Sequence, residues 1–299
     1  MYDNGAFDLG SFAAATKELC GLGEIGCDVT ARSILGREIP AFTLGSGKKA
    51  VVYVGALCGT EALVSGMLLD FIEDYVKRYQ KDSKVFDVAM QYLFRERRII
   101  VVPMLNPDGV DYATKGVSED NPIRTRVLQM NGGEDFSLWR ANARGVDLSH
   151  NFDAGYAAHK NGERARGILN GAPFGYGGEY PESEPESAAL CRMLRFLGED
   201  LLGVIELHLG HGEIFCSCKD NLSAKTMAAG RILGRATGYR LIGPEKALPQ
   251  GGLADWCIEK LYRPAYRVDC DAAKYAPDKA RACLFEAMRR ALYTFPFML

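Results

Sequence analysis

The sequence has no strong excess of charge of one sign. Among its 299 residues, 36 are Lys or Arg and 38 are Asp or Glu, which gives a formal net charge of −2. Proteins that bind nucleic acid or an anionic membrane surface usually concentrate Lys and Arg on one face. The charge balance therefore predicts neither kind of partner.

Long apolar runs and targeting segments are missing as well. No apolar stretch reaches the length of about 20 residues that a membrane-spanning helix needs. Residues 1–10 lack the basic start and apolar core of a secretory signal, so we expect a cytoplasmic protein. Neither an internal repeat nor a Pro- or Ser-rich linker interrupts the chain, and we expect one domain over residues 1–299.

The sequence also lacks a CxxC pair. It has nine Cys, an odd number, and one residue separates Cys216 from Cys218. Several others lie in apolar runs, among them Cys191, Cys257 and Cys283. This pattern is typical of buried thiols in a reducing compartment rather than of a disulfide framework.

Short apolar runs alternate with stretches of helical spacing along the chain. We expect strands at residues 50–56, 98–104, 203–207, 214–218 and 264–269. We expect helices at residues 61–79, 184–197, 222–237 and 277–293, the second of them with a capping box of Ser183 and Glu186. The alternation predicts an α/β fold whose mostly parallel or mixed sheet is covered on both faces.

Two Gly-rich polar stretches separate these elements, at residues 118–135 and 153–182. Loops of that length inside a compact domain are usually functional or are ordered by a partner.

Polar residues follow the ends of the predicted strands. Cys58 and Glu61 come directly after the strand at residues 50–56, and His208 follows the strand at residues 203–207. In open α/β sheets, ligands bind beyond the carboxyl ends of strands. A thiolate, a carboxylate and an imidazole are also ligands that one metal ion can share. These three residues therefore predict a metal site.

Two further features accompany this group: Arg140, which follows Trp139 and precedes the run GVDLSHNF at residues 145–152, and Asp269, near the end of the last strand. Taken singly, each of the four features is weak, since an Arg beside a Trp is usually a packed or solvated pair. Their order along the chain is what favours a shared site.

With the motifs that accompany them, these features resemble the zinc carboxypeptidases of the carboxypeptidase A type, most closely the bacterial branch that includes γ-D-glutamyl-diaminopimelate peptidases. The resemblance runs from about residue 33 to about residue 271. It rests on the runs PMLNPDGV (103–110), NARGVDL (142–148), SEPE (183–186) and GGLADW (251–256). It implies a three-layer α/β/α fold with a mixed, mostly eight-stranded sheet.

The resemblance also implies a mechanism. One zinc ion is held by an HxxE motif and a later His, and its open position carries a water that a Glu deprotonates. Here Glu61 and His208 keep their places, whereas Cys58 replaces the first His. Cys is a good zinc ligand, but its added negative charge would make the ion less electrophilic. Arg140 keeps the place of the residue that polarises the scissile carbonyl and stabilises the oxyanion.

Other family positions are changed. Asp269 replaces the general base Glu and is shorter by one methylene, and a misplacement on the order of 1.5 Å can cost about a hundredfold in rate. Ser149 and His150 replace the Asn-Arg pair that holds a terminal carboxylate, which His cannot grip as the Arg fork does. The active-site Tyr has no counterpart, since Ala247 falls near its position.

Arg267 stands where the family commonly has Thr in its specificity pocket. Residues two apart on a strand share a face, so we expect Arg267 and Asp269 both to point into the cleft. Arg267 could anchor an acidic group of the substrate. Alternatively, it could pair with Asp269 and weaken that residue as a base.

Three functions remain open on the sequence alone. The first is a zinc-dependent peptidase or amidase of altered specificity that acts on a small acidic peptide or amino-acid conjugate. The second is a non-catalytic family member that binds a ligand or partner in the inherited cleft. The third is an enzyme that uses Cys58 as a nucleophile, with His208 to raise its thiolate fraction.

Overall fold

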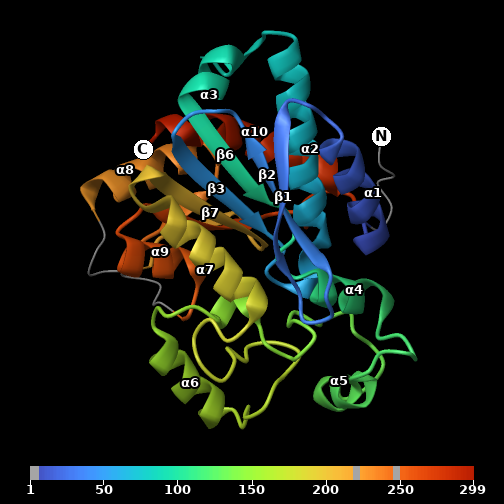
Figure 1. Ribbon diagram of the computed structural model, residues 1–299. Helices are drawn as coiled ribbons and strands as arrows, with labels where there is room; N and C mark the ends of the chain where they lie inside the picture. Colours follow the sequence, from blue (N-terminus) through green and yellow to red (C-terminus); the bar gives the residue numbers. More distant parts are fainter. Residues whose placement is uncertain (1–6, 218–222, 245–249) are drawn as a thin grey trace.

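A mixed eight-stranded sheet forms the centre of the computed structural model, which describes residues 7–217, 223–244 and 250–299 (Figure 1). The strand order is β1-β2-β6-β3-β7-β10-β8-β9. The strands are β1 (Ile25–Arg32), β2 (Glu38–Leu44), β3 (Lys49–Gly55), β6 (Arg97–Val102), β7 (Leu201–Leu209), β8 (Glu213–Phe215), β9 (Arg240–Ile242) and β10 (Ala265–Cys270). Two short strands, β4 (Lys84–Val85) and β5 (Val88–Ala89), pair separately in antiparallel fashion.

The four central strands β6, β3, β7 and β10 run parallel to one another. Antiparallel strands flank them, because β2 pairs with β6 and β8 pairs with β10 in the opposite direction. The carboxyl ends of the four central strands therefore meet at one edge of the sheet.

Helices cover both faces of this sheet, with α7 and α9 on one side and α2 and α10 on the other (Figure 1). Because both faces are covered, β3 is buried over its whole length after Lys49. The helices are α1 (Leu9–Cys20), α2 (Ala62–Gln80), α3 (Met90–Glu96), α4 (Pro107–Lys115), α5 (Arg124–Asn131), α6 (Tyr156–Ala165), α7 (Pro185–Leu197), α8 (Ala224–Thr237), α9 (Leu253–Leu261) and α10 (Ala280–Thr294).

The predicted three-layer α/β/α fold is confirmed. The five predicted strands correspond to β3, β6, β7, β8 and β10, and the four predicted helices to α2, α7, α8 and α10. Residue 218 of one predicted strand and residue 222 of one predicted helix lie outside the described residues. Within the described ranges, no helix is both long and apolar enough to cross a membrane.

Two local predictions are wrong. The helix α7 takes Glu184 as its N-cap and Pro185 as its first residue, so Ser183 stands one position too early for a capping box with Glu186. The two long stretches are not simple loops, because they contain α5 and α6. The buried residues of α6 are His159 and Glu163, so this helix has no apolar periodicity that a sequence could reveal.

The expectation of free, buried thiols needs a correction as well. Cys20, at the end of α1, forms a disulfide with Cys27 on β1. A disulfide between neighbouring elements needs only a short Cα–Cα distance, here 5.4 Å, which the sequence does not reveal. Cys191 and Cys257 are free and buried as predicted, whereas Cys283 is only partly buried.

Candidate functional site

The predicted site residues converge at the carboxyl edge of the parallel strands. Cys58 follows β3, and Asp269 on β10 lies directly beside His208 on β7 in the sheet register. The same register places Arg267 beside Glu206. Because side chains alternate along a strand, these four residues of β7 and β10 project from the same face of the sheet.

A tight turn brings Cys58 and Glu61 together. The short 3₁₀ helix η1 (Gly59–Glu61) follows Cys58, whose backbone N–H donates to Glu61 Oε2 over 3.2 Å. Gly59 is required here, because a Cβ at this position would lie 2.4 Å from the carbonyl oxygen of Gly109 and 2.6 Å from that of Trp139. The turn is thereby pressed against the segment that carries Arg140.

Cys58, Glu61 and His208 form a compact buried group whose ligand atoms all lie within 4.8 Å of one another. His208 Nδ1 is 2.9 Å from Glu61 Oε1 and 4.0 Å from Cys58 Sγ. All three side chains are fully or almost fully buried. The structure thus brings together the three residues that the sequence predicts as metal ligands.

The protonation of this group follows from its burial and mutual contacts. Burial alone would lower the pKa of His208, but the Glu61 carboxylate and the neighbouring Cys58 raise it well above its usual value. Burial alone would raise the pKa of Glu61, yet the charge of His208 keeps it below the usual value. Without a metal, the two therefore form a buried ion pair.

Burial has the opposite consequence for Cys58. Burial first, and then the nearby Glu61 and Asp147 carboxylates, raise the pKa of the Cys58 thiol to about 12. A thiol with that pKa is almost wholly protonated near neutral pH and is a poor nucleophile. Burial and the neighbouring carboxylates thus disfavour the thiolate that a metal-free catalytic nucleophile at Cys58, the third function left open by the sequence, would need.

Arg140 and Asp147 surround the thiol. Arg140 Nη2 lies 2.9 Å from Cys58 Sγ, and its Nε lies 3.7 Å from Asp147 Oδ2. Asp147 Oδ1 is 3.9 Å from the same sulfur. Burial would raise the pKa of Asp147, but His150 and Arg140 hold it well below the usual range, so this carboxylate stays charged. Asp147 lies in the run at residues 142–148, but nothing in the sequence indicated that it would face the Cys58 thiol.

Ser149 and His150 are both engaged in internal hydrogen bonds. Ser149 Oγ donates to Asp147 Oδ1 over 2.6 Å, and His150 Nδ1 lies 2.6 Å from the carbonyl oxygen of Gln250. The His150 ring also stacks on His159, with ring centroids 4.1 Å apart. Burial, and then His150, lower the pKa of His159 to about 4, so His159 is neutral near pH 7.

Arg267 and Asp269 bind each other. Arg267 donates through Nε to Asp269 Oδ1 over 2.7 Å and through Nη2 to Asp269 Oδ2 over 2.9 Å. This two-pronged pair is the second of the two arrangements that the sequence allowed for Arg267. Ala247, the counterpart of the missing Tyr, lies outside the described residues.

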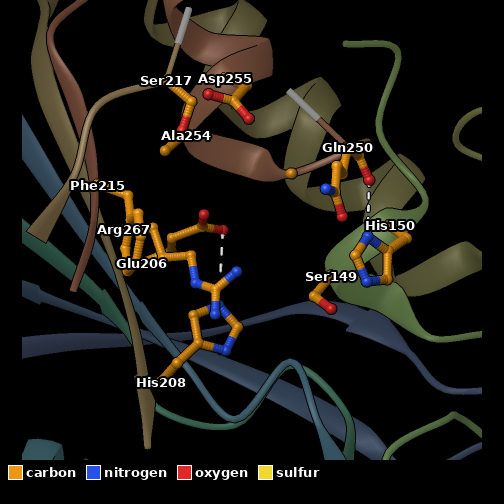
Figure 2. A pocket seen from close by; sticks show the side chains of 11 residues that line it. Ser149, His150, Glu206, His208, Phe215, Ser217, Gln250, Ala254, Asp255 and Arg267 are labelled. Atoms are coloured by element: carbon orange, nitrogen blue, oxygen red, sulfur yellow. Dashed lines mark hydrogen bonds and ion pairs between the residues drawn. The ribbon is translucent and has the colours of Figure 1, made fainter. Parts of the chain in front are cut away.

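A cavity of about 420 Å³ opens beside this pair (Figure 2). Its lining includes the predicted residues Ser149, His150, His208 and Arg267. It also includes two acidic residues that sequence reasoning missed, Glu206 and Asp255. The signal for Glu206 was its position two residues before His208, which places both side chains on one face of the strand. The signal for Asp255 was its place in the motif at residues 251–256.

The donor set suits zinc. Thiolate sulfur, imidazole nitrogen and carboxylate oxygen are the three atom types that bind Zn²⁺ in proteins, and three protein ligands are usual at catalytic zinc sites. Cys58, Glu61 and His208 offer one of each within a single buried group. Their arrangement is therefore compatible with a zinc ion that keeps one position open.

Solved structures share this fold. A carboxypeptidase A from Helicoverpa armigera matches with a TM-score of 0.66 and 18% identity over 95% of this chain and 70% of that chain. The murein-tripeptide amidase MpaA from Escherichia coli O157 matches with a TM-score of 0.55 and 22% identity over 90% of this chain and 92% of that chain.

Sequence comparison gives the family. A gamma-D-glutamyl-L-diamino acid endopeptidase 1 from Lysinibacillus sphaericus is 26% identical over 238 residues, which cover 79% of this chain. This chain spans only 58% of that relative's length. The model of the zinc carboxypeptidase family, Peptidase_M14, matches residues 9–226, which is more than half of the sequence. With the sheet, the buried ligand group and this match all in agreement, the chain belongs to the zinc carboxypeptidase family.

Proposed function

We propose that this protein is a zinc-dependent hydrolase that cleaves an amide bond in a small peptide or amino-acid conjugate. The observation that carries the proposal is the buried group of Cys58, Glu61 and His208 at the carboxyl edge of the parallel strands. Burying a carboxylate, an imidazole and a thiol together costs folding free energy unless their charges are paired or bind a metal. The curated relative's name supports an amide substrate with a diamino acid on its amine side.

Three residues would hold the metal, and two others would act on the substrate. Cys58, Glu61 and His208 would hold a zinc ion, which would supply an acidified water and polarise the scissile carbonyl. Arg140, whose guanidinium lies against Cys58, would stabilise the negative charge that develops on the carbonyl oxygen. Asp269, next to His208 in the sheet, is the proposed base that takes a proton from the attacking water.

The second candidate is a family member that binds a ligand without turnover. The pairing of Arg267 with Asp269 favours it, because both oxygens of the proposed base already accept hydrogen bonds. Asp269 could act as a base only if one of these bonds were released during the reaction. The acidic substrate predicted from the sequence relied on Arg267, whose Nε and Nη2 are both committed to Asp269.

Turnover of a defined amide panel tests the proposal. Protein supplied with zinc should release the amine from at least one γ-glutamyl or diamino-acid amide, and a chelator should stop the reaction. Asp269→Asn should lower kcat by about 10²–10⁴-fold, since it removes the proposed base. Asp271→Asn, a carboxylate two residues further along and outside the cavity lining, is the matched control and should leave kcat unchanged. If the protein binds one equivalent of zinc but hydrolyses no member of the panel, the second candidate, a ligand-binding protein without turnover, is supported instead.

A further inference from the structure

Two imidazole rings stack face to face beside the cavity. His150 ends the short 3₁₀ helix η2 (Leu148–His150) and lines the cavity (Figure 2), and His159 lies in the first turn of α6. Their ring centroids are 4.1 Å apart, and the ring planes differ by 15°. His159 is 8% exposed, whereas His150 is partly exposed. Since His150 lines the cavity and His159 does not, His159 supports the stack from the protein interior.

The ring of His159 is anchored by polar groups on and beside α6. Its Nε2 lies 3.1 Å from the carbonyl oxygen of Gly175 and 3.2 Å from Glu163 Oε1. Glu163 is fully buried and also accepts a hydrogen bond from the Gly177 N–H over 2.7 Å, while Lys160 pairs with its other oxygen. Because a carbonyl oxygen can only accept, Nε2 of His159 carries the hydrogen. These contacts fix both the tautomer and the orientation of the ring.

His159 is also neutral, which suits a stacked neighbour. Burial, and then His150, lower the pKa of His159 to about 4. A neutral ring can lie against His150 without charge repulsion, whether or not His150 carries a proton. His159 can therefore hold the stack throughout the pH range near neutrality.

His150 itself is held by a hydrogen bond at only one ring nitrogen. Its Nδ1 lies 2.6 Å from the carbonyl oxygen of Gln250, so Nδ1 is the donor of this bond. Its Nε2 makes no hydrogen bond within the part of the chain that the structure describes, and the ring borders the cavity. The second side-chain torsion of His has broad minima, so one hydrogen bond fixes the ring plane only loosely. The stack on His159 supplies the second restraint.

We propose that His159 is a positioning residue, which holds the ring of His150 in the plane that presents Nε2 to a polar group of the substrate. The inference rests on the proposed hydrolase function, because the cavity that His150 lines also reaches His208. Nε2 of His150 can accept a hydrogen bond when the ring is neutral and donate one when it is protonated. His159 is not part of the cavity lining, so it acts on the substrate only through His150.

Nuclear magnetic resonance of the zinc-supplied protein tests the stack without any need for turnover. The chain has only 4 His, so the ring signals of His150 and His159 can be assigned with single variants. Because each ring lies over the face of the other, we expect the ring protons of His150 to be shifted upfield and to show cross-relaxation with those of His159. Wild-type protein without these two signatures would overturn the inference.

Two variants separate the stack from the hydrogen bonds of His159. His159→Phe keeps an aromatic ring but lacks the donor to Gly175 and Glu163, and it should keep the upfield shift of His150. His159→Gln keeps an N–H donor but has no ring, and it should lose that shift. The signals of the exposed His211 should not change in either variant, and if one variant does not fold, comparison of the other with wild type still decides. A shift that survives in His159→Gln and is lost in His159→Phe would show that the hydrogen bonds, rather than the stack, hold His150.

The expected consequence for the substrate is a change in its affinity. For a panel amide that the wild type hydrolyses, His159→Gln should raise KM about threefold to tenfold and change kcat by less than about twofold, since aromatic pairs contribute on this scale. His159→Phe should keep the wild-type KM, because it keeps the stack. An unchanged KM in His159→Gln would overturn the positioning role.

This result is separable from the test of hydrolysis. If the protein hydrolyses no member of the panel, the dissociation constants of the same amides, measured by isothermal titration, take the place of KM. Weaker binding by His159→Gln without hydrolysis contradicts the proposed function and leaves the positioning role intact. Hydrolysis with equal KM in the wild type and in His159→Gln contradicts only the positioning role.

Discussion

The two regions on either side of His208 balance their charges in different ways. On the metal side, Glu61 pairs with His208, and Asp147 is bound by Ser149 and faces Arg140. On the pocket side, Glu206 Oε2 has no hydrogen bond among the described residues and lies 3.9 Å from His208 Nε2, and burial raises the pKa of Asp255 to about 7. A fully hydrogen-bonded cluster holds its side chains in fixed positions, whereas a buried oxygen that lacks a hydrogen bond is costly.

The largest effect is expected from removing a ligand on the metal side. His208→Ala should reduce bound zinc from about one ion per chain to nearly none and abolish hydrolysis, because a catalytic zinc site needs its three protein ligands. Metal analysis of the purified, zinc-supplied variant measures this. His211→Ala, an exposed histidine three residues further on, is the control and should keep its zinc. A His208→Ala protein with a full equivalent of zinc would show that the metal is held elsewhere.

A smaller effect on zinc binding is expected from Asp147, which contacts the proposed ligand Cys58. Asp147→Asn should weaken zinc binding by about 10–100-fold, because Asp147 supports both Ser149 and the surroundings of Cys58. Competition with a chromogenic chelator measures the affinity. Asp153→Asn, at an exposed position six residues later, should leave it unchanged. If the zinc affinity of Asp147→Asn equals that of the wild type, the contacts of Asp147 do not set the geometry of the ligands.

The smallest effect is a stability difference on the pocket side. Because the pKa of folded Asp255 is raised to about 7, the folded protein favours the protonated carboxyl. The stability that the folded protein gains from protonating Asp255 is therefore fully present at low pH and is lost as the pH rises through about 7. Asp255→Asn mimics the protonated form, so its Tm relative to wild type should increase from pH 4 to pH 8.

Thermal unfolding measures the Tm difference between Asp255→Asn and the wild type, and the same difference for a control variant. A gain of about 1 kcal/mol raises Tm by roughly 2–4 °C in a chain of this size, and we expect a shift of at least this order at pH 8. Asp278→Asn, at an exposed position, should show no such pH-dependent difference. A Tm difference for Asp255→Asn that is constant between pH 4 and pH 8 would contradict the raised pKa.

The sequence was sufficient for much of the fold because its signals are local. The run at residues 50–56 is apolar throughout, as a strand covered on both faces must be, and it became β3. By contrast, α6 was missed because its buried face consists of His159 and Glu163. The disulfide between Cys20 and Cys27 was missed because it depends on how α1 and β1 lie against each other.

The sequence by itself determined the family and the identity of the proposed ligands, because order and spacing along the chain place Cys58, Glu61 and His208 at strand ends. Only the tertiary structure decided that Arg267 is bound to Asp269. Only the tertiary structure showed that Glu206 Oε2 lies 3.9 Å from His208 Nε2. The physical reason is that alternation along one strand fixes which side chains share a face. Which of the charges on that face pair depends on the side chains that the neighbouring strands and helices pack around them.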